Sequence, residues 1–285
     1  MRIAVPLLVV TGIGMVPVFA QDSMKPAPVL NILREAIKEG RGAAHEKVEA
    51  EYTAAFRKAN FPEHYVALST LSGPNEVWFI QPMPSFAANE DYEKAADKEP
   101  LKGALAMLDA RDGELRASSR AMWAVYRPDI SYKPEKFNPG KTRYVDVGTF
   151  RVRLGREEDF VSGTKAYFGG YGKGNVDLCI LGYQVTAGAP AGTYLFFTMM
   201  DSMKVMDGRP ERMKAVVEGT GREDFAKLMK GAGDVIASIE DTLFEVKPGM
   251  SYPPQNILDA DPGFWKPKPA MKPAAPAPAE KKGVQ

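Results

Sequence analysis

Residues 176–200, VDLCILGYQVTAGAPAGTYLFFTMM, decide the fold of this chain. Two apolar runs, 176–185 and 193–200, flank the turn AGAPAG and predict two antiparallel strands. Successive positions of both runs are apolar, whereas an antiparallel sheet with one wet face alternates hydrophobic and polar residues. We therefore expect both faces of this hairpin to be covered.

The segments around the hairpin complete a β-α-β-β-α-β unit, the ferredoxin-like order. Thr220 and Glu223 have the spacing of a capping box at the start of a helix. The glycine-rich run 169–174 is interpreted as a flexible connection between elements. The elements predicted for this half are a strand at 144–153, a helix opened by 155–158, the strands 176–185 and 193–200, a helical region, and a strand at 241–247.

The first half of the chain repeats this order. Residues 126–132 resemble residues 246–252, which lie 120 positions later, and EVWFIQ (76–81) parallels TYLFFT (193–198). Gly40-Arg41 parallels Gly155-Arg156, 115 positions later. The elements predicted for this half are a strand at 29–38, a helix at 42–59, strands at 64–71 and 76–81, helices within 87–120, and a strand at 121–127.

The predicted fold class is therefore α+β, with two ferredoxin-like βαββαβ repeats packed sheet to sheet. In each repeat, two helices cover one face of the sheet, and the sheet of the other repeat is the expected cover for the second face. The predicted domains are a signal peptide at 1–20, a linker at 21–28, the first repeat at 29–134, a linker at 135–143, the second repeat at 144–254, and a disordered Pro/Ala/Lys-rich tail at 255–285.

Two such units resemble the dimeric α+β barrel superfamily, which includes NIPSNAP-type proteins, antibiotic-biosynthesis monooxygenases and chlorite-dismutase-like haem proteins. The resemblance covers about residues 29–253. It rests on the element order and on the pattern that opens each half. In that pattern, a strand is followed by Gly-Arg (Gly40-Arg41, Gly155-Arg156) and then by an acidic helix with an aromatic stripe. This opening resembles a NIPSNAP-type start. The resemblance implies an intrachain dimeric α+β barrel with a small, mostly apolar cavity between sheet and helices in one or both halves.

The two ends of the chain predict export and a tether. Residues 1–20 carry Arg2, a long apolar run, and small residues before Gln21, the layout of a cleaved signal peptide. A membrane anchor is the alternative, which the prolines and glycines of the run weaken. We expect a periplasmic or secreted protein. From Lys266 onward, Pro, Ala and Lys favour a solvated polyproline II tether, which could contact the cell envelope.

Composition excludes several classes. The chain has 285 residues, with 37 Lys and Arg against 36 Asp and Glu, which argues against a nucleic-acid binder. No segment after the leader is apolar enough to span a membrane. The single Cys, Cys179, excludes an internal disulfide and is interpreted as a buried strand residue. Because the chain has only two His, a metal site would need carboxylate help. We predict no metal and no cofactor.

Two functions stay open: binding of a small apolar ligand in a sheet–helix pocket, and a cofactor-independent monooxygenase-like enzyme. Haem binding is a third. The resemblance places a haem-ligating His in the second half, which has none. We expect His45 to be solvated, since Arg41, Glu46 and Lys47 surround it in the sequence. No catalytic residue is predicted, and the chain is expected to be a monomer or a weak homo-oligomer. The candidate pocket residues are Tyr52, His64, Tyr65, Trp78, Gln81, Trp123, Tyr167 and Tyr194.

Overall fold

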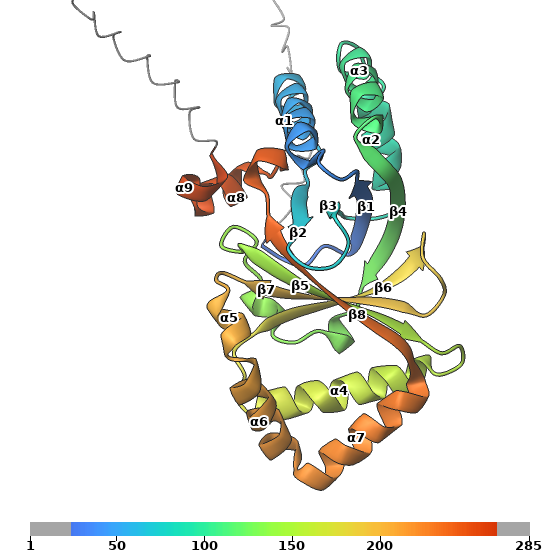
Figure 1. The fold of residues 1–285 in the computed structure, drawn as a ribbon, viewed down its shortest axis with the longest axis vertical. Coiled ribbons are helices and arrows are strands. Elements are labelled where there is room, and N and C mark those ends of the chain that lie inside the picture. The colour runs from blue at the N-terminus through green and yellow to red at the C-terminus, as the bar shows by residue number, and fades with distance from the viewer. Residues whose placement is uncertain (1–23, 267–285) are drawn as a thin grey trace, which may run out of the picture.

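The computed structural model describes residues 24–266 and contains a closed antiparallel barrel (Figure 1). The strand order around the barrel is β1-β3-β2-β8-β5-β7-β6-β4. The strands are β1 (Val29–Ile37), β2 (Val66–Thr70), β3 (Glu76–Met83), β4 (Arg116–Tyr126), β5 (Tyr144–Val152), β6 (Cys179–Ala187), β7 (Thr193–Met200) and β8 (Ile236–Val246). The predicted signal peptide and the tail beyond Lys266 lie outside the described residues.

Helices lie outside the barrel, in two groups. The first group is α1 (Gly42–Ala59), α2 (Ala88–Ala96) and α3 (Leu101–Gly113), and the second is α4 (Glu157–Lys173), α5 (Lys204–Asp207), α6 (Arg209–Thr220) and α7 (Arg222–Val235). Figure 1 shows the first group on the side of β1–β4 and the second on the side of β5–β8. Among the described residues, no helix has the length and apolarity needed to cross a bilayer.

Each half of the chain supplies four strands in the same order. The order is β4-β1-β3-β2 in the first half and β8-β5-β7-β6 in the second, and all neighbours are antiparallel. The register is equivalent as well: Glu35 in β1 lies opposite Ser119, and Phe150 in β5 lies opposite Ile239. The predicted α+β barrel is confirmed.

The two sheets also join at their edges, a pairing that the prediction of sheet-to-sheet packing did not include. β2 pairs with β8, where Leu68 lies opposite Val246, and β4 pairs with β6, where Val125 lies opposite Gln184. These two ladders use backbone groups that would remain unpaired at the edges of open sheets. The apolar inner faces of both halves therefore meet inside one barrel.

Barrel closure explains why the hairpin at 176–200 is apolar on both faces. Leu195 and Phe197 of β7 point into the barrel and belong to its core. Tyr194 and Phe196 of the same strand belong to a second cluster, which packs under α4 and α6. One face of the hairpin is thus covered by the barrel interior and the other by helices.

Three further expectations about local structure are corrected. The glycine-rich run 169–174 is the C-terminal turn of α4 and its cap, since α4 continues to Lys173. The capping box at Thr220 is absent: Thr220 ends α6, and Gly221, with φ near +90°, is the N-cap of α7. A glycine is suited to this position because L side chains are strained at such a φ.

Part of the segment predicted as a tail, 255–285, is folded. Residues 255–265 form two short helices, α8 (Gln255–Ala260) and α9 (Pro262–Trp265), and these pack on the barrel core. Trp265 is buried and its Nε1 donates to the carbonyl of Gly140 at 2.9 Å. Arg143 stacks on Phe264 and pairs with Asp261. Apolar residues spaced through a Pro-rich context explain why composition alone missed this segment.

Candidate functional site

A cavity of about 1220 Å³ lies between the outer face of β5–β8 and helices α4, α6 and α7. Small residues of α7, Gly231 and Ala232, line it and leave room beside the strands. Its aromatic wall consists of Phe150, Phe160, Tyr167, Phe168, Tyr171 and Phe196. An apolar cavity of this kind, with a few polar groups, is the usual form of a small-molecule site.

Polar groups of the cavity gather on β5, β7, β8 and α6. Asp146 of β5 lies opposite Thr198 of β7 in the sheet, and Asp241 and Arg209 line the same cavity. Burial raises the pKa of Asp146, the charge of Asp241 raises it further, and Arg209 lowers it. A carboxyl group with a raised pKa beside an apolar space is a candidate functional group.

The hydroxyl groups of Tyr167 and Tyr171 lie 3.4 Å apart on α4 and can hydrogen-bond each other. Burial is the main cause that raises the pKa of Tyr167. No histidine lines this cavity among the described residues. An iron porphyrin placed here would therefore lack an imidazole ligand, and the cavity does not fit haem held through histidine.

The structure distributes the eight sequence-predicted pocket residues over several places. Tyr167 lines the large cavity, and Tyr194 packs beneath its wall against Phe160, with ring centroids 4.7 Å apart. His64 and Tyr65 line a smaller cavity of about 390 Å³, which Ile257 of α8 also lines. Burial lowers the pKa of His64.

The other four predicted residues lie on the elements of the first half. Trp78 is inside the barrel and its Nε1 donates to Glu76 at 2.8 Å. Gln81 accepts a hydrogen bond from Asn31, and Trp123 packs on Phe86. Tyr52 donates to Asp109, between α1 and α3. The eight residues therefore do not line one common pocket.

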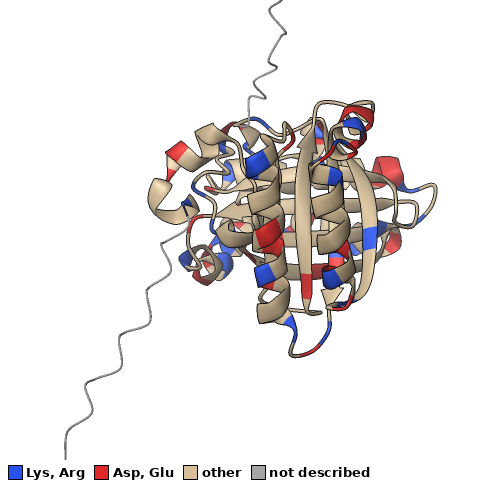
Figure 2. Ribbon diagram, turned by 90° about the horizontal axis from the view of Figure 1, so that it is seen from above, with Lys and Arg blue, Asp and Glu red and all other residues tan. Residues whose placement is uncertain are grey.

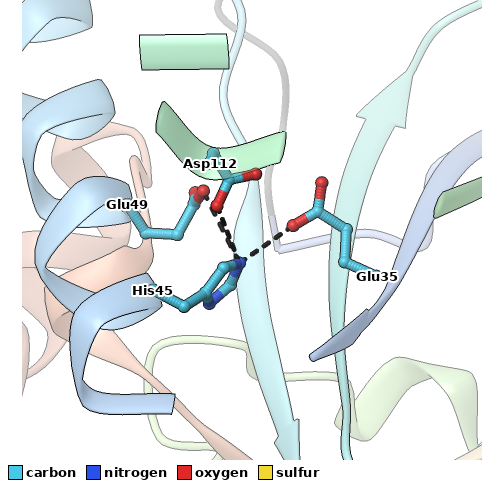
Figure 3. A group of neighbouring side chains, drawn as sticks. All are labelled: Glu35, His45, Glu49 and Asp112. Carbon is cyan, nitrogen blue, oxygen red and sulfur yellow. Dashed lines mark hydrogen bonds and ion pairs between the residues drawn. The ribbon is translucent and has the colours of Figure 1, made fainter. Parts of the chain in front are cut away.

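Sequence reasoning missed a buried polar cluster in the first half, which we call the Glu-His cluster: Glu35, His45, Glu49 and Asp112 (Figure 3). Glu35 lies on β1, His45 and Glu49 on α1, and Asp112 on α3. All four residues are at most 5% exposed. Nε2 of His45 lies 2.9 Å from Glu35 Oε2, 3.4 Å from Asp112 Oδ1 and 3.8 Å from Glu49 Oε1.

Arg116, the first residue of β4, provides the cationic partner of this cluster. Its Nη1 lies 2.5 Å from Glu35 Oε1 and its Nε 2.8 Å from Asp112 Oδ2. Burial is the largest cause that raises the pKa of Glu49, to about 9, and the negative charge of Glu35 is the second. The same two causes, in the same order, raise the pKa of Asp112. One guanidinium thus faces three buried carboxyl groups.

The expectation that His45 is solvated is wrong. Arg41, Glu46 and Lys47 are exposed, but His45 and Glu49 lie on the inner face of α1. Viewed from above, Figure 2 shows acidic and basic residues on the two helices that lie across this face of the sheet. The signal available in the sequence was the i, i+4 spacing of His45 and Glu49, which places both side chains on one helix face.

Comparisons with known proteins give fold likenesses without a family. The chain matches no family model, and no curated protein matches it significantly. It is similar to the structure of an anthrone oxidase-like protein, at 16% identity, over 77% of this chain and 92% of that chain, with a TM-score of 0.49.

Two further solved structures are similar at the same level. One is a proposed monooxygenase from Lactobacillus acidophilus NCFM, at 7% identity over 77% of this chain and 94% of that chain, with a TM-score of 0.47. The other is a chlorite dismutase mutant from Candidatus Nitrospira defluvii, at 10% identity. The match covers 84% of this chain and 98% of that chain, with a TM-score of 0.49. At these scores and identities we draw no activity from them.

Proposed function

We propose that this protein binds a small, largely apolar, ring-shaped molecule in the cavity between β5–β8 and helices α4, α6 and α7. The observation that carries the proposal is the cavity itself, about 1220 Å³ with a wall of six aromatic residues. Aromatic walls give flat apolar ligands a large contact area. The polar end at Asp146 and Arg209 would orient a ligand that carries one polar group.

The test uses a neutral fluorescent probe, N-phenyl-1-naphthylamine, which brightens in an apolar site. We expect saturable binding to the full chain and its loss in Gly163→Leu. Gly163 lines the cavity from α4, and a Cβ placed there meets only Leu228 at 3.7 Å, so a larger side chain extends into the cavity.

Gly169→Leu is the matched control. Gly169 lies on the same helix, is exposed, and a Cβ there meets nothing within 4 Å. Both substitutions favour the helix, because glycine is a poor helix former. Equal probe binding by the two variants, or no binding by the unaltered chain, would overturn the proposal.

A cofactor-independent monooxygenase-like enzyme is the second candidate, and Asp146 is the observation that favours it. Its raised pKa suits a base that removes a proton from an electron-rich substrate held in the cavity. Oxygen uptake above the spontaneous rate with a panel of polyphenols would support this activity. Asp146→Asn should then abolish uptake and retain binding of the probe.

The two halves are further proposed to be ferredoxin-like repeats of one duplicated unit, supported by their equal strand orders and equivalent registers. Closure of the barrel within one chain supports a monomer or a weak homo-oligomer. The leader motif supports export to the periplasm or medium. An intact mass that begins at Gln21 in the exported protein would test this, and a cytoplasmic full-length chain would contradict it.

A further inference from the structure

We propose that the Glu-His cluster of Glu35, His45, Glu49 and Asp112 binds a divalent first-row transition metal ion. The site is separate from the ligand cavity, since it lies in the other half of the barrel. Its four side chains come from β1, α1 and α3, so a bound ion would clamp both helices to the strand. The proposal stands on geometry, on an excess of acceptors, and on a comparison of the two halves.

The distances fit a small ion. One oxygen or nitrogen atom from each of the four residues can be chosen so that all lie within 4.8 Å of one another. Around a tetrahedral ion with bonds of about 2.1 Å, two ligand atoms are about 3.4 Å apart. The distances from His45 Nε2 to the three carboxylate oxygens, 2.9, 3.4 and 3.8 Å, bracket that value.

Hydrogen bonding within the cluster leaves acceptors unused. A proton on His45 Nε2 can serve Glu35, at 2.9 Å. Among the described residues, Asp112 Oδ1 is buried and has no hydrogen-bond donor, and Glu49 Oε1 lies 3.8 Å from His45 Nε2, beyond hydrogen-bond distance. Buried carboxylate oxygens without a donor are costly, and a cation at the point where they converge would satisfy them.

Arg116 orients two of the candidate ligands. It holds Oε1 of Glu35 and Oδ2 of Asp112, so that the second oxygen of each carboxylate is directed towards His45. Hydrogen bonds of this kind to the outer atoms of ligands are typical of metal sites. With neutral His45, three carboxylates and one guanidinium leave two negative charges, which one divalent ion would neutralise.

The second half shows that the fold does not require these charges. The offsets of 115 and 120 residues place Phe150, Phe160, Thr164 and Ala232 at the positions of Glu35, His45, Glu49 and Asp112. The first residues of α1 and α4, Gly42 and Glu157, obey the same 115-residue offset. All four equivalents line the apolar cavity. The same place in the barrel therefore accepts uncharged residues, and the first half carries an imidazole and three carboxyl groups there instead.

The donor set indicates which ions to test. One imidazole with three carboxylates suits zinc, manganese or iron(II), whereas calcium and magnesium prefer oxygen ligands alone. A catalytic metal site keeps one coordination position open for water or substrate. Because all four side chains here are almost fully buried, a structural role of the ion is favoured over a catalytic role.

The experiment compares the full chain with Glu49→Gln, after chelator treatment and titration with Zn²⁺, Mn²⁺ and Co²⁺. We expect one ion per chain by elemental analysis, and visible absorption bands from bound Co²⁺. Glu49→Gln should weaken the affinity by about 100-fold or more, in line with the loss of a ligand. The substitution keeps the shape and volume of the side chain, so folding should be retained.

Glu51→Gln is the matched control on the same helix, because Glu51 is exposed and pairs with Arg111 outside the cluster. It should bind metal like the unaltered chain. Failure of the unaltered chain to bind any of the three ions would overturn the proposal, and so would equal affinity in Glu49→Gln. In either case the cluster is a metal-free network of buried polar side chains. Loss of probe binding in the large cavity would not affect this result.

Discussion

Truncation of Trp265 should destabilise the protein, because this residue is buried in the core of the barrel. Trp265 is 1% exposed, packs in the barrel core, and donates to the carbonyl of Gly140. Replacing a buried Trp with Ala costs about 3–5 kcal/mol. Trp265→Ala should therefore lower the free energy of unfolding by about 4 kcal/mol, measured by urea denaturation at constant pH.

Two variants separate packing from hydrogen bonding. Trp265→Phe keeps most of the buried ring but removes one of two donors to the Gly140 carbonyl, since Arg143 Nη1 also donates to it at 3.2 Å, and this should cost about 1 kcal/mol or less. Lys266→Ala alters the exposed neighbour and should have no measurable effect. If α8 and α9 detach locally, the loss is limited to their docking free energy, and proteolysis would then cut before residue 266. A loss below about 1 kcal/mol in Trp265→Ala, without new cleavage, would refute the packing argument.

Three other predictions follow from buried charged and reactive groups. In chelator-treated protein, Arg116→Met should lower the free energy of unfolding by about 3 kcal/mol, since it leaves Glu35 and Asp112 buried without a cation; an unchanged urea midpoint would contradict this. Because the pKa of Asp146 is raised in the folded state, its folded form binds more protons than the unfolded form, so stability falls as pH rises through the ordinary Asp range. Asp146→Asn should therefore gain stability over the unaltered chain at about pH 7 but not at about pH 3, and equal differences at both would be inconsistent with that shift. Burial raises the pKa of the Cys179 thiol to about 11, so a thiol reagent should label it only after denaturation; rapid labelling of the native chain would disprove its burial in the barrel.

The apolar strands that are covered on both faces were the easiest elements to predict. The apolar runs at 176–185 and 193–200 correspond to β6 and β7, and the helix at 42–59 has the bounds expected. By contrast, β4 and β8 begin at Arg116 and Ile236, several residues before their predicted starts. Their first residues are exposed and pair with β1 or β5 alone, so no apolar pattern identified them.

The sequence also predicted a sheet–helix cavity without locating its wall. Of eight candidate residues, Tyr167 lines the large cavity, because the aromatic stripe of α4 was visible as a helical pattern. The wall residues on strands and on α7 come from positions far apart in the chain, which only the barrel register brings together. The Glu-His cluster escaped for the same reason: Glu35 and Asp112 join His45 through the contact of β1 and α3 with α1.

Because one chain supplies both halves of the barrel, the outer faces of the two halves can differ in sequence. A single-unit chain that paired with its own copy would carry the same residue at both equivalent positions, because a two-fold interface repeats each surface. Here His45 can sit in a polar cluster while Phe160, at the equivalent position, forms part of the cavity wall. A polar residue at 160 would place an unpaired group in the apolar wall, and an apolar residue at 45 would leave three carboxyl groups without an imidazole. The two sites therefore require different sequences at equivalent positions, and one chain with two units can carry both.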